Sequence, residues 1–128
     1  MATIRHHTRV DAPADRVWGI VTDPAGIADW ADGIDTATFD GTSRTLTAMG
    51  MEIVEEIVTN DADLRRFQYS ITEGPVPLEH HLATIDVLED GDGALLVYSL
   101  ELRPDGLKDF FDGLAAGVVQ QLKTAAER

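Results

Sequence analysis

Residues 104–128 have the sequence PDGLKDFFDGLAAGVVQQLKTAAER, and the pattern of this segment constrains the rest of the architecture. Its apolar side chains recur every three or four residues, which places them on one face of an α-helix. The apolar stripe comprises Leu107, Phe111, Leu114, Val118, Leu122 and Ala125, and Lys108, Asp109, Asp112 and Lys123 lie on the opposite side. Such a helix must bury its stripe, so we expect it to pack on a β-sheet formed by the preceding segments. It would span roughly 30 Å, enough to cross a small domain.

The segments before this helix alternate apolar and polar residues and are separated by turn residues, as in an antiparallel sheet. The predicted strands are Asp35 to Phe39, Arg44 to Met49, Met51 to Thr59, Leu64 to Thr72, Glu79 to Leu88 and Ala94 to Leu102. Gly50 is interpreted as either a turn or a β-bulge. On the Met51 to Thr59 strand, Ile53, Glu55 and Ile57 share one face, but the neighbouring face is nearly as apolar. Which of the two points inward is therefore left open.

The N-terminal third supplies one more strand and two short helices. Thr3 to Val10 alternates as a strand, with Ile4, His6, Thr8 and Val10 on one face. Pro13 suits the first turn of a helix, and Asp23-Pro24 repeats that signal for a second short helix that extends through Trp30. We therefore predict an α+β fold, in which a curved antiparallel sheet of about seven strands wraps around the long C-terminal helix. Two short helices follow the first strand.

Composition limits the possible functions. With 128 residues the chain is expected to form a single domain over residues 1–128. The net charge of −13 disfavours nucleic acid, and the absence of cysteine excludes disulfides and cysteine-ligated metals. No apolar run is long enough to insert into a membrane, and no secretory h-region is visible, so a cytoplasmic protein is expected. Phosphate-loop and calcium-loop motifs are missing, and we expect no metal and no cofactor. A monomer or weak homodimer is expected.

Three motifs carry a resemblance to a known family: DAPADRVW at 11–18, TDPAGIADW at 22–30 and QQLKTAAE at 120–127. With the order of elements, they resemble the START-like superfamily, and most of all its bacterial polyketide cyclase/dehydrase and lipid-transport branch. The resemblance covers nearly the whole chain and includes Pro13, Val17, Trp18, Asp23, Trp30, Arg44, Glu55, Tyr69, Pro75 and Tyr98. It implies the helix-grip fold and a cavity beneath the long helix. It says little about chemistry, because this fold carries cyclases, hydrolases, lipid carriers and receptors.

Polar residues on the expected inner faces are the candidates for a site, since burying them is costly unless they are paired or used. The candidate catalytic residues are Glu55, His81 and Tyr69. The candidate ligand-binding residues are His6, Thr8, Trp30, Glu55, Tyr69, His81, Tyr98, Phe110, Phe111, Leu114, Gly117, Val118 and Gln121. An inward Glu55 would have a raised pKa and could act as an acid or base. The structural alternative is a set of hydrogen-bonded core residues.

Gly113 and Gly117 interrupt a helix at a cost of roughly 1 kcal/mol each relative to alanine. Either close packing on the sheet or room for a ligand could offset that cost, and both explanations stay open. The first functional hypothesis is binding of a small hydrophobic or amphipathic molecule, lipid- or polyketide-like, in an internal cavity. The second is a cofactor-independent cyclase or dehydratase that uses pocket His, Glu and Tyr side chains. The third is a protein-interaction module with a vestigial cavity.

Overall fold

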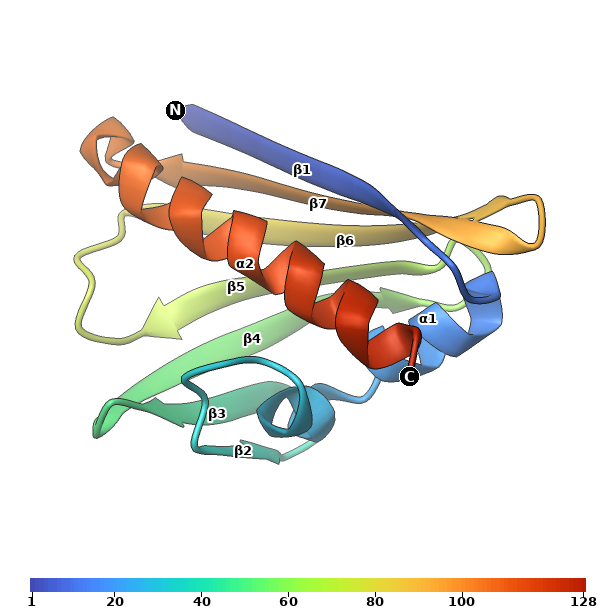
Figure 1. Cartoon of the computed structure of the whole chain (residues 1–128). Helices are drawn as coiled ribbons and strands as arrows, with labels where there is room; N and C mark the ends of the chain where they lie inside the picture. Colours follow the sequence, from blue (N-terminus) through green and yellow to red (C-terminus); the bar gives the residue numbers. More distant parts are fainter.

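The computed structural model describes all 128 residues, and Figure 1 shows one curved sheet crossed by a long helix. The elements are β1 (Ala2–Val10), α1 (Ala14–Val21), the 3₁₀ helix η1 (Pro24–Asp29), β2 (Thr36–Phe39), β3 (Ser43–Ala48), β4 (Met51–Asp61), β5 (Arg66–Glu73), β6 (His80–Asp90), β7 (Gly93–Arg103), the 3₁₀ turn η2 (Asp105–Leu107) and α2 (Lys108–Ala126). The predicted α+β class and helix-grip architecture are confirmed. The second short helix is a 3₁₀ helix.

The seven strands form one antiparallel sheet in the order β1-β7-β6-β5-β4-β3-β2. Every pair except β1 with β7 joins strands that follow one another in sequence, as in a meander. β1 closes the edge by pairing with β7 along its whole length, from Ala2 opposite Leu102 to Val10 opposite Ala94. In Figure 1, α2 lies across the concave face, and η1 with the following loop lies over β3 and β2.

The chain reverses between β3 and β4 through a two-residue turn at Met49 and Gly50, whose φ angles are 51° and 75°. Two successive positive φ angles suit the right-handed twist of the flanking strands, and glycine adopts this conformation without strain. Of the two interpretations of Gly50, the turn is therefore the one that the structure shows. The register shifts occur further along β4, between Val54 and Glu55 and between Ile57 and Thr59.

The buried face of α2 is rotated relative to the stripe predicted from the sequence. Its fully buried side chains are Phe111, Ala115, Val119, Leu122 and Ala126. Leu114 is 50% exposed and Phe110 is 54% exposed. The apolar residues of α2 cover more of its circumference than one sheet face can bury, and the helix packs mainly on β1 and α1. The prediction that Leu114 belongs to the buried stripe is wrong for that reason.

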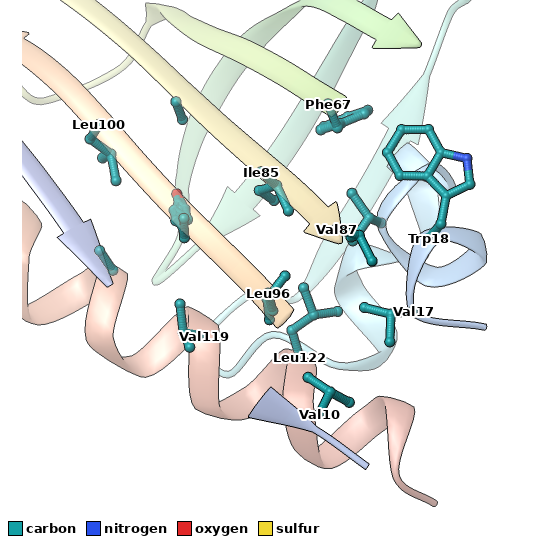
Figure 2. Packing of buried hydrophobic residues seen from close by; sticks show 14 of the residues in the cluster. Val10, Val17, Trp18, Phe67, Ile85, Val87, Leu96, Leu100, Val119 and Leu122 are labelled. Atoms are coloured by element: carbon teal, nitrogen blue, oxygen red, sulfur yellow. The ribbon is translucent and has the colours of Figure 1, made fainter. Parts of the chain in front are cut away.

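The solid part of the core lies where α1, β1 and the C-terminal half of α2 meet. Figure 2 shows Val10, Val17, Val87, Leu96 and Leu122 converging there, and each is at most 1% exposed. Complete burial of one such aliphatic side chain contributes about 1.5–3 kcal/mol. Side chains from the sheet, α1 and α2 therefore pack directly against one another at this end of the molecule.

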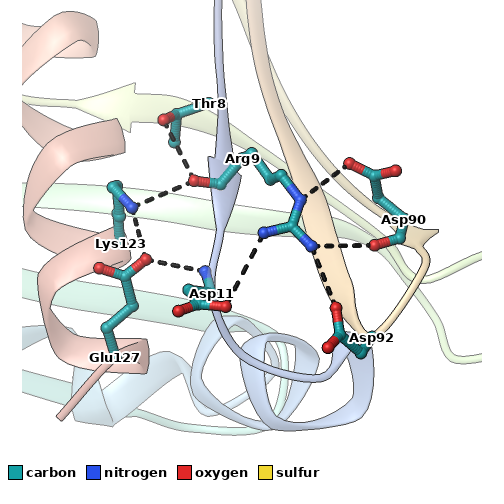
Figure 3. Close-up of polar contacts among 7 residues, drawn as sticks. All are labelled: Thr8, Arg9, Asp11, Asp90, Asp92, Lys123 and Glu127. Carbon is teal, nitrogen blue, oxygen red and sulfur yellow. Dashed lines mark hydrogen bonds and ion pairs between the residues drawn. The ribbon is translucent and has the colours of Figure 1, made fainter.

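Polar contacts on the surface tie β1 to its neighbours at the same end (Figure 3). Arg9 pairs with Asp90 at 3.2 Å and with Asp92 at 3.3 Å in the β6–β7 turn. On the helix side, Lys123 donates to the carbonyl of Arg9 at 3.1 Å, and Glu127 accepts from the backbone N–H of Asp11 at 2.8 Å. Exposed pairs of this kind contribute about 0–1 kcal/mol each. They connect the end of β1 to the β6–β7 turn and to α2. No helix in the structure is both long and apolar enough to cross a membrane.

Candidate functional site

A pocket of about 200 Å³ lies between α2, the concave face of the sheet and the η1–β2 segment. Eleven of its fifteen lining residues are hydrophobic. The lining comprises Ile27, Ala31, Asp32, Ile34, Leu46, Ile53, Glu55, Tyr69, Ile71, His81, Tyr98, Phe111, Leu114, Val118 and Gln121. The pocket lies beside the solid core, and α2 contributes Leu114 and Val118 to its wall.

The sheet separates at this pocket. β5 and β6 are paired only from Arg66 opposite Asp86 to Tyr69 opposite Ala83, and Figure 1 shows β5 diverging from β6 beyond that point. The next inward residue of β5, Ile71, donates its backbone N–H to Nδ1 of His81 at 3.1 Å. A histidine side chain thus replaces the backbone acceptor that the ladder would have supplied, which satisfies a group that would be costly to leave unpaired.

This hydrogen bond fixes the protonation of His81. An acceptor Nδ1 carries no proton, so the neutral ring has its proton on Nε2. Burial lowers the pKa of His81 to about 4, with a further contribution from the adjacent His80. The ring packs between Tyr69, at 5.9 Å between centroids, and Phe111, at 5.6 Å. At neutral pH, His81 is therefore an immobilised neutral donor.

A buried ion pair with Arg44 holds Glu55, which lines the pocket on the same sheet. Arg44 and Glu55 face one another across β3 and β4 and are 3% and 5% exposed. Nε and Nη2 of Arg44 both contact Oε1 of Glu55, at 2.8 and 2.7 Å, and Nη1 donates to the carbonyl of Pro24 at 3.3 Å. Burial raises the pKa of Glu55, while the Arg44 guanidinium acts in the opposite direction. Because both contacts use Oε1, the second oxygen of the carboxylate is left for the pocket.

Two tyrosines lie between these groups. The hydroxyls of Tyr69 and Tyr98 are hydrogen-bonded to each other, and the Arg44 guanidinium lies 5.1 Å from the centre of the Tyr69 ring. Burial raises the pKa of Tyr98 to about 12 and that of Tyr69 well above its usual value. Both phenols are neutral at physiological pH. Since one hydroxyl donates to the other, the pair retains one proton that can be directed at a third group.

Eight of the residues predicted from the sequence line the pocket: Glu55, Tyr69, His81, Tyr98, Phe111, Leu114, Val118 and Gln121. The structure thereby resolves the facing of β4, because Glu55 points inward. The register shift beside it keeps Glu55 opposite Ile71 of β5.

Five others lie outside the pocket: His6, Thr8, Trp30, Phe110 and Gly117. His6 pairs with Asp112 of α2 at 2.8 Å, because β1 lies directly beneath the helix, and Thr8 donates to the carbonyl of Arg9. Phe110 points into solvent. A side chain at Gly117 would meet only Nε2 of Gln121, at 3.3 Å. The helix rotation turns this glycine away from the sheet and from this pocket, so close packing on the sheet does not account for it.

Arg44, which holds Glu55 in place, was not among the predicted site residues, although the sequence contains a signal for it. A two-residue turn at Met49-Gly50 pairs Ala48 with Met51. Counting back from that turn places Arg44 directly opposite Glu55, and opposite charges in that position attract. No such signal places Ile27, Ala31 and Ile34 in the lining, because Ile27 lies on one short 3₁₀ helix and Ala31 and Ile34 follow it outside any helix or strand.

The chain belongs to the family described as polyketide cyclase / dehydrase and lipid transport, whose model matches residues 1–128. No curated protein matches it. Among solved structures, it is similar to the protein XoxI from Bacillus cereus, with a TM-score of 0.89 and 24% identity over 98% of this chain and 95% of that one.

Norcoclaurine synthase from Thalictrum flavum, solved with dopamine and hydroxybenzaldehyde, has a TM-score of 0.75 and 22% identity over 97% of this chain and 85% of that one. A START superfamily protein from Mycobacterium smegmatis has a TM-score of 0.75 and 16% identity over 98% and 94% of the two chains. At these identities the solved structures show a shared fold.

Proposed function

We propose that the chain binds a small hydrophobic or amphipathic molecule, lipid- or polyketide-like, in the pocket beneath α2. The observation that carries the proposal is the composition of the lining, in which eleven residues are hydrophobic, the two tyrosines included, and the remaining four include Glu55 and His81. Apolar walls with few convergent polar groups are typical of small-molecule sites. The family description, which names polyketide cyclases and lipid transport, supports the same proposal.

The volume favours a compact ligand. At about 200 Å³ the pocket is smaller than the roughly 300–1,000 Å³ of sites for drug-sized molecules and larger than the roughly 150 Å³ cavity that accepts benzene. One or two fused rings fit without rearrangement. A long acyl chain would have to extend past the exposed side of Leu114 or displace the segment around Ala31.

Titration with 2-naphthol, followed by its intrinsic fluorescence and by calorimetry, tests the proposal. We expect saturable binding with one site per chain. Val118→Phe, which adds volume inside the pocket, should abolish binding, whereas Gln120→Phe on the exposed side of the same helix should not. Circular dichroism checks that both variants are folded. Absence of saturable binding to the parent protein would refute the proposal and favour the interaction module.

A second candidate function is proton-transfer catalysis of the cyclase or dehydratase kind, favoured by the placement of Glu55, Tyr69 and Tyr98 on one pocket. The Glu55 carboxylate would remove a proton from the carbon next to a ligand carbonyl, and the free tyrosine proton would stabilise the resulting enolate oxygen. His81 would not act as the base, because its Nδ1 accepts from Ile71 and its Nε2 already carries the proton.

Deuterium exchange distinguishes the two functions. The methyl protons of 2-acetonaphthone in D₂O, followed by NMR, should exchange faster with the protein than with buffer if Glu55 acts as a base. Glu55→Gln should return the rate to that of buffer. Binding of the ketone without accelerated exchange would identify a carrier.

A further inference from the structure

We propose that the pocket selects uncharged ligands that carry both a hydroxyl and a carbonyl, and that it rejects carboxylates. This inference rests on the proposed binding function and specifies the ligand chemistry at the same site. It is carried by two fixed polar atoms of opposite character, Oε2 of Glu55 and Nε2 of His81, which lie on either side of one residue, Ile71.

The first fixed atom is a hydrogen-bond acceptor. Arg44 directs both of its contacts to Oε1 of Glu55, so Oε2 accepts no hydrogen bond from the protein. The only side-chain nitrogen or oxygen that is sealed from solvent without a partner is Nε1 of Trp30. Oε2 is therefore open to the pocket that Glu55 lines. A ligand hydroxyl can donate to it in a charge-assisted hydrogen bond.

The second fixed atom is a donor. The Ile71 N–H donates to Nδ1 of His81, so the ring presents its own N–H at Nε2. Nε2 has no protein partner and is not among the atoms sealed from solvent, so it is open to the pocket that His81 lines. The rings of Tyr69 and Phe111 pack against His81 and hold its orientation. His81 cannot exchange donor for acceptor without breaking its bond to Ile71. Nε2 can donate a hydrogen bond to a ligand carbonyl, but it cannot accept one from a ligand hydroxyl.

The spacing of the two atoms follows from the sheet. Glu55 lies opposite Ile71 on the neighbouring strand, and His81 contacts Ile71 from the next strand. Glu55 and His81 are thus two strands apart, and because β5 and β6 have separated here, their backbones lie more than about 10 Å apart. Their inward side chains shorten the gap to the length of a small ring system. A hydroxyl and a carbonyl at opposite ends of one bicyclic scaffold can reach both atoms.

Charge excludes anionic ligands. The pocket already contains the Glu55 carboxylate, and the three Arg44 contacts to Glu55 and Pro24 occupy its one guanidinium. His81 is neutral, and no lysine lines the pocket. A ligand carboxylate would lose its hydration without gaining a cationic partner. The net charge of −13 adds a weaker repulsion at longer range.

Four naphthalenes of matched size test the proposal by calorimetry: 2-naphthol, 2-acetonaphthone, 6-hydroxy-2-acetonaphthone and 6-hydroxy-2-naphthoic acid. We expect the hydroxy ketone to bind about tenfold more tightly than either compound with one polar group, and the acid at least about tenfold more weakly than 2-naphthol. Equal affinities for all four would overturn the selectivity and leave the binding function intact. Tightest binding of the acid would overturn it as well. Binding of none would instead refute the proposed function.

His81→Phe provides a matched variant, because it keeps an aromatic ring between Tyr69 and Phe111 and has neither the Nδ1 acceptor nor the Nε2 donor. The affinity for the hydroxy ketone should fall to that for 2-naphthol, and the affinity for 2-naphthol should not change. His81→Gln, whose amide can accept from Ile71 and donate into the pocket, should retain part of the selectivity. An unchanged preference for the hydroxy ketone in folded His81→Phe would overturn the role of Nε2. The four ligands on the parent protein test the selectivity even if a variant fails to fold.

Discussion

The backbone N–H of Ile71 donates to Nδ1 of His81 over 3.1 Å, just where the backbone pairing of β5 with β6 has ended. This one hydrogen bond allows the sheet to separate without leaving a buried amide unpaired, and it determines which nitrogen of His81 carries the proton. The separation of the strands and the chemistry of the pocket therefore have a common origin.

The depressed pKa of His81 predicts a pH-dependent stability. Burial holds the folded-state value at about 4, against 6.5 for a free side chain. Between these values the unfolded chain binds more protons, so the free energy of unfolding rises with pH. The contribution of His81 to stability is complete above pH 6.5 and is lost as the pH falls towards 4. At about 1.4 kcal/mol per pH unit, the total loss is about 3 kcal/mol.

Urea unfolding at several pH values between 4 and 7, for the parent and for His81→Phe, measures this contribution. The difference in unfolding free energy between the two proteins should change with pH as stated, because Glu55, His80 and the other titrating groups are common to both. A constant difference would contradict a neutral, buried His81.

The Arg44–Glu55 pair predicts strong coupling between two single substitutions. Arg44→Met leaves a buried carboxylate without its partner and should lower the free energy of unfolding by about 3–5 kcal/mol. Glu55→Leu should be similarly destabilising. The double variant should be less destabilised than the sum of the two, because no unpaired charge remains. Chemical denaturation of all four proteins gives the coupling energy, and additive effects would show that the pair does not act as a unit.

The rotation of α2 predicts a contrast between two of its apolar residues. Phe111 is 4% exposed, and Phe111→Ala should destabilise the protein by about 3–5 kcal/mol. Leu114 is 50% exposed, and Leu114→Ala should cost less than about 1 kcal/mol. Both are measured by thermal and urea unfolding. Equal losses would mean that the helix packs with the face that the sequence periodicity suggests.

The glycines of α2, neither of which packs on the sheet, predict a gain in stability. A Cβ at Gly113 would meet no atom within 4 Å, so Gly113→Ala should stabilise the protein by about 1 kcal/mol through helix propensity alone. Gly117→Ala is the matched control, because its Cβ would meet Nε2 of Gln121 at 3.3 Å, and its gain should be smaller. Differential scanning calorimetry can resolve the two. A loss of stability in Gly113→Ala would place that face of the helix against other parts of the protein.

The order and type of the elements follow from local features of the sequence. Alternation from Thr3 to Val10 and in the six later strands, proline at the start of the short helices, and three-four spacing after Pro104 are all properties of neighbouring residues. They predicted the α+β class with a curved sheet wrapped on the last helix, and the family resemblance implied the helix-grip fold; both are confirmed. The inward placement of Tyr69, His81 and Tyr98 followed from the same period of two.

Three features depended on tertiary structure. Phe111, Ala115 and Val119 are buried because β1 and α1 determine how α2 lies. The periodicity of the helix sequence by itself allowed more than one rotation. Glu55 faces inward through its pairing with Arg44 and the register shift beside it, which no pattern within β4 reveals. His81 became a fixed donor only because β5 leaves β6 at Tyr69. Spacing along a chain determines which residues share a face, whereas partners distant in sequence determine where that face points and which atoms remain free.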